Sequence, residues 1–109
     1  MKAKAIKHYD RMIKFAKSEI DEGGKTVNAD RMRQSIREDW YAGSCPYCKK
    51  YMIHHECLSG TLCIKCPLMP TGKTDDCCNG LWMEMSKAST WKEFIVCAER
   101  VKEYIRENG

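Results

Sequence analysis

The sequence has no apolar run long enough to cross a membrane, and its first residues lack the uninterrupted apolar stretch of a secretory signal. Both absences lead us to expect a cytoplasmic protein with no membrane partner. In that compartment disulfides are rare, and clustered cysteines are more often metal ligands or catalytic groups. The sequence therefore argues against a secreted scaffold held by four disulfides, although its eight cysteines are an even number.

A strong charge of one sign is also missing. Nineteen Lys and Arg residues against fifteen Asp and Glu residues give a net charge of +4. The excess lies mainly in residues 1–41, which hold ten basic and seven acidic residues, whereas residues 42–85 hold four of each. This balance does not indicate the strong positive field of a dedicated nucleic-acid-binding domain.

Familiar catalytic patterns are absent as well. The sequence shows no Ser/His/Asp set and no pair of carboxylates spaced for acid–base catalysis. The adjacent Asp75 and Asp76 are typical of a turn. Gly72-Lys73-Thr74 looks like the end of a phosphate-binding loop, but the position of its first glycine holds Pro67 and no apolar strand leads in. We therefore expect a protein that is not an enzyme.

What the sequence does have is a cluster of cysteines. Seven of the eight lie within 34 residues, from Cys45 to Cys78. Four of them form two Cys-x-x-Cys pairs, Cys45/Cys48 and Cys63/Cys66, with 14 residues between the pairs. Two residues between thiolates let both sulfurs reach one ion from a tight turn, and two such turns complete a tetrahedron around zinc. Because four thiolates leave no open position for water, the sequence predicts a closed, structural zinc site.

Further cysteines and histidines leave the ligand set open. One alternative tetrad leaves Cys63 spare and consists of Cys45, Cys48, Cys66 and either Cys77 or Cys78. Since adjacent cysteines rarely both bind one ion, we expect one of the last two to point into the core. The sequence also allows a second site built from His55, Cys57 and a late cysteine. For each of the two histidines at 54–55, exposure in a loop is the simpler expectation.

Two redox interpretations compete with zinc. An iron–sulfur cluster is the main one, because Cys-x-x-Cys spacing and a Cys-Pro step also occur in ferredoxin-like sites, but the paired spacing favours zinc. The other is a dithiol enzyme, since Cys45-Pro46-Tyr47-Cys48 is identical to the active-site tetrapeptide of glutaredoxins. In that family the motif follows a strand inside a βαβ unit, whereas here a helical pattern precedes it. We therefore do not expect redox activity from Cys45 and Cys48.

Helical periodicity lies on both sides of the cysteine-rich region. Apolar residues spaced for one helix face run through residues 3–20, and Gly23-Gly24 ends that helix. A second helix is expected from a cap at Asn28 or Asp30 to about Tyr41.

The last helix has the clearest start. Thr90-Trp91-Lys92-Glu93 fits a capping box, and a short helical piece is expected before it at residues 80–87. The expected core residues of the whole chain are Ile6, Tyr9, Ile13, Ile36, Trp40, Leu81, Trp82, Phe94, Ala98, Val101 and Ile105.

Together these patterns predict a mainly α fold, a small single domain over residues 1–109 with three helices and a loop-rich, zinc-knuckle-like cysteine region. Its parts are a helical N-terminal part over residues 1–41, a metal-binding region over residues 42–80 and a C-terminal helix within residues 81–109.

Several motifs also carry a resemblance. They are His8-Tyr9-Asp10-Arg11-Met12-Ile13-Lys14, Cys45-x-x-Cys48, Cys63-x-x-Cys66-Pro67-Leu68, Cys77-Cys78-Asn79-Gly80-Leu81-Trp82 and Thr90-Trp91-Lys92-Glu93. From about Tyr9 to its end, the chain is similar in these motifs to small cysteine-rich proteins encoded by bacteriophages. The resemblance implies a metal-binding protein made in the cytoplasm of an infected bacterium, and it implies no established activity.

The function class that we expect is an interaction or regulatory module that binds a host or viral macromolecule. A closed metal site builds a rigid surface without supplying chemistry, which favours a protein partner. Nucleic acid is the second expectation, since several basic side chains are available to phosphates although they lie on different helical faces. These are Lys4, Lys7, Arg11, Arg31, Arg33 and Arg37, with Lys49 and Lys50 nearby.

Overall fold

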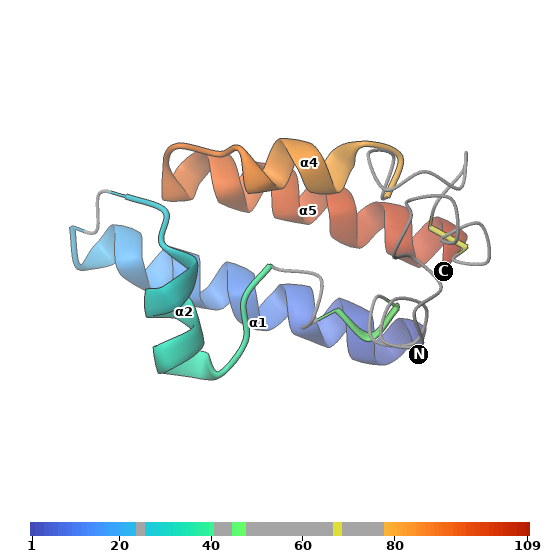
Figure 1. Ribbon diagram of the computed structural model, residues 1–109, viewed down its shortest axis with the longest axis horizontal. Helices are drawn as coiled ribbons and strands as arrows, with labels where there is room; N and C mark the ends of the chain where they lie inside the picture. Colours follow the sequence, from blue (N-terminus) through green and yellow to red (C-terminus); the bar gives the residue numbers. More distant parts are fainter. Residues whose placement is uncertain (24–25, 41–44, 48–66, 69–77) are drawn as a thin grey trace.

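Four helices make up most of what the computed structural model describes, and no strand occurs in that part of the chain (Figure 1). The described residues are 1–23, 26–40, 45–47, 67–68 and 78–109. The helices are α1 (Lys2–Asp21), α2 (Ala29–Ile36), α4 (Leu81–Ser86) and α5 (Trp91–Asn108). The mainly α prediction is therefore confirmed, while most of the cysteine-rich region lies outside the described residues.

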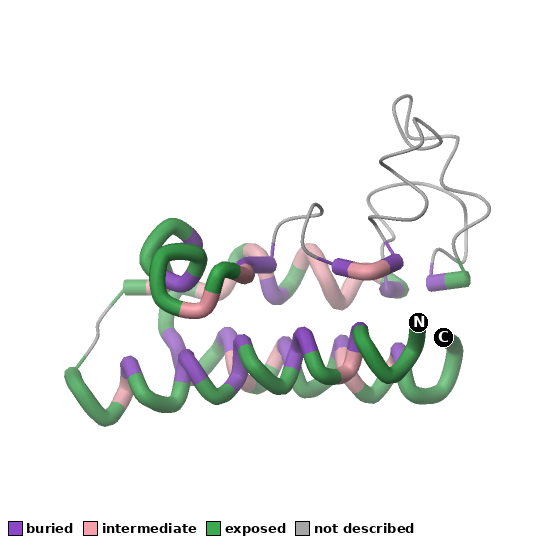
Figure 2. Tube along the Cα trace, turned by 90° about the horizontal axis from the view of Figure 1, so that it is seen from below, coloured by how far each residue is buried: buried purple, intermediate pink, exposed green. Residues whose placement is uncertain are grey.

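The two long helices form the base of the molecule. α1 and α5 run antiparallel along each other, so that the two ends of the chain lie at the same end of the pair (Figure 1). Figure 2 shows α2 and α4 on one side of this pair, together with residues 45–47. The core lies between these two layers.

The start of the chain forms α1 almost as predicted, but the buried face of the helix is rotated. Ala5 and Met12 are fully buried, whereas Ile6 and Ile20, which the apolar spacing had placed on the buried face, are only partly buried at its edge. The polar residue His8 is buried instead, because its ring has a partner outside the helix. Gly23 follows the helix with a φ of 79°, consistent with its predicted role as a stop.

The second helix is shorter than predicted. Asn28 caps it as expected, since its side chain accepts a hydrogen bond of 3.1 Å from the Arg31 N–H. The helix ends at Ile36 rather than near Tyr41 because Arg37 adopts the left-handed conformation with a φ of 60°. Its N–H donates to the Arg33 carbonyl, as in a left-handed helix cap. The prediction of a helix reaching Tyr41 was therefore wrong.

This left-handed cap gives a testable prediction. Replacing Arg37 by glycine should raise the free energy of unfolding by up to about 1 kcal/mol. A non-glycine residue in the left-handed conformation costs about 1–2 kcal/mol, which glycine avoids, but the more flexible unfolded chain of the glycine variant offsets part of this gain. Urea denaturation measures the change. As a control, the same substitution at the exposed mid-helix residue Gln34 should lower stability by about 1 kcal/mol. Destabilisation by both glycines would contradict the assigned conformation.

α5 begins as its capping box predicts. The Thr90 hydroxyl accepts from the Glu93 N–H at 3.1 Å, and the Glu93 carboxylate accepts from the Ser89 N–H at 3.1 Å. The return bond therefore reaches one residue before the cap, not the cap itself, which still satisfies a free amide at the helix start.

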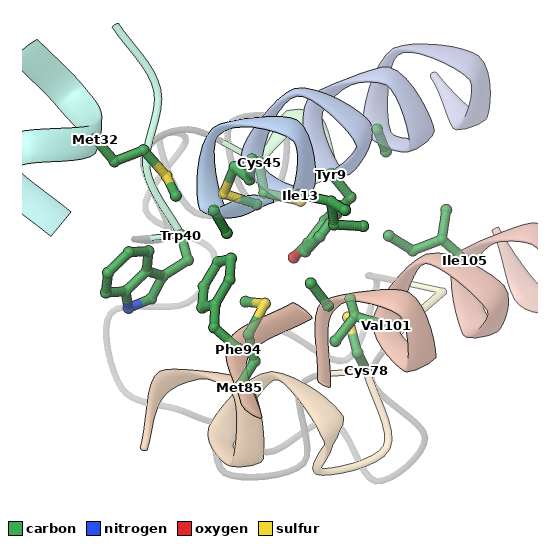
Figure 3. Packing of buried hydrophobic residues seen from close by; sticks show 14 of the residues in the cluster. Tyr9, Ile13, Met32, Trp40, Cys45, Cys78, Met85, Phe94, Val101 and Ile105 are labelled. Carbon is green, nitrogen blue, oxygen red and sulfur yellow. The ribbon is translucent and has the colours of Figure 1, made fainter. Parts of the chain in front are cut away.

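An aromatic cluster at the centre of the core joins three parts of the chain. The Trp91 ring meets the rings of Phe15 and Phe94 edge to face, each at 5.6 Å between centroids. Trp40 packs on Phe94 at 5.0 Å, and Figure 3 shows both side chains between α2 and α5. Residues 38–40 thus lie across α1 and α5 although they are not helical.

Most of the predicted core is buried. The buried members are Tyr9, Ile13, Trp40, Phe94, Ala98, Val101 and Ile105, while Ile6, Ile36, Leu81 and Trp82 are partly buried at its edge. Trp82 stays at the edge because its indole N–H donates to the Trp40 carbonyl at 2.7 Å. The prediction omitted Trp91, which is 2% exposed and lies three residues before Phe94 on the same helix face.

Among the described helices, none combines the length and apolar character that crossing a membrane requires.

Candidate metal centre and its supports

The first predicted metal ligand lies where the cysteine-rich segment leaves the helical framework. Residues 45–47 run beside the N-terminal half of α1 (Figures 1 and 2). The Cys45 side chain is 5% exposed and belongs to the hydrophobic core (Figure 3). Tyr47 is 3% exposed, and its hydroxyl lies so close to the end of α5 that a side chain at Gly109 would collide with it. The segment therefore starts from a fixed position between α1 and α5.

The other end of the segment is buried in the same core. Cys78 is 1% exposed and lies beside Val101 and Met85 in Figure 3. Its N–H donates to the Leu68 carbonyl at 2.8 Å, and Leu68 is 1% exposed. This bond fixes the chain on both sides of residues 69–77. The burial agrees with the expectation that one of the two adjacent cysteines points into the core.

The remaining predicted ligands lie outside the described residues. These are Cys48, Cys63 and Cys66 of the main tetrad and the secondary candidates His55, Cys57 and Cys77, with His54 beside them. Within the described part, no three His, Cys, Asp or Glu side chains gather as they would around an ion. A buried thiol at position 45 suits a closed site, since such a site excludes water. The zinc ligand set stays a prediction.

A polar network that the sequence analysis missed supports the region beside Cys45. His8 in α1 is 1% exposed, and its Nδ1 lies 3.1 Å from Oε1 of Glu38. Arg11, one turn along α1, donates to both oxygens of the same carboxylate. Nearby, the buried Asp39 accepts from Arg33 at 2.6 Å. These pairs tie residues 38–39 to α1 and α2, which explains why polar residues follow α2.

The burial of His8 shifts its protonation. Burial lowers the pKa of His8 below 6.5, and the hydrogen bond to Glu38 only partly offsets it. Arg11 lowers the pKa of Glu38, so this carboxylate is charged at neutral pH and accepts a hydrogen bond from the Nδ1–H of the neutral ring. The other ring nitrogen, Nε2, is buried and has no hydrogen-bond partner among the described residues. A second proton would therefore place a charged N–H donor without a partner in the core.

This arrangement predicts that the protein loses stability in mildly acidic solution. The unfolded chain binds a proton at His8 near pH 6.5 and the folded protein only at lower pH, so the free energy of unfolding falls as pH drops through 6.5. Urea denaturation between about pH 7.5 and about pH 5.5 measures this dependence. The variant His8→Gln should show a shallower pH dependence over the same range. An equally steep dependence in the variant would assign the effect to other groups.

Cys97, the one cysteine far from the cluster in sequence, lies in a different place. It is half-buried in a shallow groove of about 510 Å³ between α4 and α5, lined also by Glu84, Lys92 and Arg100. Burial raises the pKa of the Cys97 thiol, which keeps it protonated at neutral pH. Cys97 is therefore a suitable control position for tests of the metal site.

Three of the basic side chains that the sequence suggests as phosphate contacts are paired with carboxylates in the structure. Arg11 is bound to Glu38, Arg31 donates to the buried Glu19 at 2.6 Å, and Arg33 is bound to Asp39. These arginines stabilise the packing of α1 against α2 and residues 38–39. They are therefore poor candidates for contacts with another molecule.

Comparison with protein-family models, with curated proteins and with solved structures finds no match to this chain. The resemblance to cysteine-rich phage proteins therefore stays a prediction.

Proposed function

We propose that this protein is a zinc-stabilised interaction module, encoded by a bacteriophage and acting in the host cytoplasm, that binds a host or viral macromolecule. Cys45, Cys48, Cys63 and Cys66 would hold the zinc, with Cys77 or Cys78 in place of Cys63 in the alternative tetrad. Bound zinc would supply folding free energy to a region that is rich in Gly, Pro, Thr, Asp and Cys and that a core alone would hold poorly. The surface that binds the partner would lie on the rigid structure formed by the helices together with the zinc-bound segment.

The observation that carries this proposal is the burial of both ends of the cysteine-rich segment in one core. Cys45 and Cys78 are 5% and 1% exposed and belong to the same cluster as Phe94 and Val101. Because the segment is held at both ends, a metal site within it can also restrict the motion of the helices that hold those ends. A closed site of four thiolates also leaves no position for a substrate, which favours binding over catalysis.

A capture experiment tests the proposed function. The zinc-loaded protein, carrying an affinity tag, would be used to recover binding partners from a lysate of infected cells. We expect one defined macromolecule with the native protein and with Cys97→Ser, and a clear loss with Cys48→Ser, which removes a ligand from both tetrads. Capture of nothing reproducible by the native protein would contradict an interaction module, and equal capture by Cys48→Ser would contradict a role for the metal.

A further inference from the structure

The exposed side of α1 carries four lysines. We define the lysine stripe as Lys4, Lys7, Lys14 and Lys17, all of which are exposed. At 3.6 residues per turn these four positions fall within about 140° of the helix circumference, opposite the buried Ala5, Met12 and Ala16. At 1.5 Å per residue the stripe is about 20 Å long. Figure 2 shows exposed positions recurring along this helix.

The charge of the lysine stripe is not neutralised within the described part of the molecule. The arginines of α1 and α2 at positions 11, 31 and 33 all have carboxylate partners, but none of the four lysines does. Two acidic side chains lie within the same angular range: Asp10 is bound to Lys102 of α5 at 2.9 Å, and Asp21 is exposed at the end of α1, four residues after Lys17. Four ammonium groups without a carboxylate partner in the described structure therefore face solvent along one side of α1.

The composition of the stripe indicates the kind of partner. Protein interfaces are depleted in lysine and depend on buried aromatic and apolar anchors. The described part of the chain exposes only two large apolar side chains, Met1 and Val96, and neither is part of the stripe. Lysine is instead a compact charge that suits the phosphate backbone of nucleic acids. α1 packs along its length on α5, so the side that carries the stripe is the side available to such a backbone.

The length of the stripe fits such a backbone. Duplex DNA carries one phosphate per 3.4 Å of axis on each strand, so about 20 Å of duplex presents about six phosphates to the stripe. We propose that the lysine stripe on α1 binds the phosphate backbone of nucleic acid without sequence preference. This inference rests on the proposed interaction function and names the chemistry of the partner.

Salt dependence tests the inference directly. The probes are a DNA duplex of about 20 base pairs and a polyuridine RNA of the same length, and the protein is the full zinc-loaded chain. Four phosphate contacts predict a slope of about −3.6 in log K against log salt for the duplex, or about 150-fold weaker binding at 200 mM than at 50 mM salt. Replacing all four lysines by glutamine should remove this slope, and Lys14→Gln with Lys17→Gln should remove about half of it.

A matched control removes the same charge elsewhere. Lys87 and Lys92 are exposed and line the groove between α4 and α5, so replacing both by glutamine should leave the slope unchanged. Absence of binding at 50 mM salt, or an equal loss in this control, would overturn the inference. Binding to polyglutamate but to neither nucleic acid would also overturn it and would assign the stripe to an acidic protein.

Two further readouts separate this inference from the proposed function. Circular dichroism and zinc content of each variant report on the fold and the metal site. A folded, zinc-bound protein that captures a defined partner but binds no nucleic acid would overturn the inference alone. Absence of zinc with intact nucleic-acid binding would instead contradict the zinc-stabilised function and leave the lysine stripe supported.

Discussion

Replacing Phe94 by alanine is expected to lower the free energy of unfolding by about 3–5 kcal/mol. Phe94 is 0% exposed, and its ring packs on Trp40 at 5.0 Å and on Trp91 at 5.6 Å between centroids. Its removal would open a cavity between rings that come from different parts of the chain and cannot easily close over it. Because small domains have a total stability of only about 5–15 kcal/mol, the variant should be close to unfolding at moderate temperature.

A control on the same helix separates this packing effect from a change in helix propensity. Val96 lies two residues further on and is 52% exposed, so Val96→Ala should change the stability by less than about 0.5 kcal/mol. Urea denaturation monitored by circular dichroism measures both variants. A loss below about 1 kcal/mol for Phe94→Ala would contradict the central position of this ring in the core.

Replacing Cys45 by serine is expected to have the second large effect, on metal content as well as on stability. In a four-thiolate zinc site, loss of one ligand removes most of the binding free energy, which is about 10–16 kcal/mol in small zinc-dependent domains. We therefore expect the zinc content to fall from about one ion per chain to near zero. Limited proteolysis should then cut within residues 48–77 much faster than in the native protein.

The comparison with Cys97→Ser makes this result specific. Cys97 lies in the groove between α4 and α5, outside residues 45–78, so its replacement should leave zinc content and protease resistance unchanged. Full zinc content in Cys45→Ser would exclude Cys45 from the ligand set. Loss of a dithiol redox activity in Cys45→Ser, with an intact fold and no metal in the native protein, would support the redox enzyme instead.

The sequence predicted the helices well because their signals are local. The capping box at Thr90 and the cap at Asn28 occur as the residue types indicate, since each depends on atoms within four residues. The predicted core of this helix began at Phe94 and so omitted Trp91, which lies beside the cap and three residues earlier on the same face. Extending the same periodicity back by three residues identifies it.

The part that the sequence did not predict depends on contacts between distant residues. The burial of His8 follows from Glu38, which reaches His8 and Arg11 across about 30 positions of sequence. The end of α2 at Ile36 follows from the left-handed conformation of Arg37, which the residue type does not indicate. Periodicity treats His8 as a polar interruption of α1 and cannot show that a carboxylate will satisfy its ring. For the candidate site, the spacing of the cysteines predicts the chemistry, and the structure adds the burial of Cys45 and Cys78.

Elemental analysis of anaerobically purified protein tests most directly whether the cysteine-rich segment is a closed zinc site attached to the helical framework. We predict about one zinc per chain, with neither iron nor sulfide. A content of about two zinc ions would extend the site to Cys57 or Cys77 and keep its structural role. Iron with acid-labile sulfide, or a folded protein with no metal, would contradict a zinc-stabilised module.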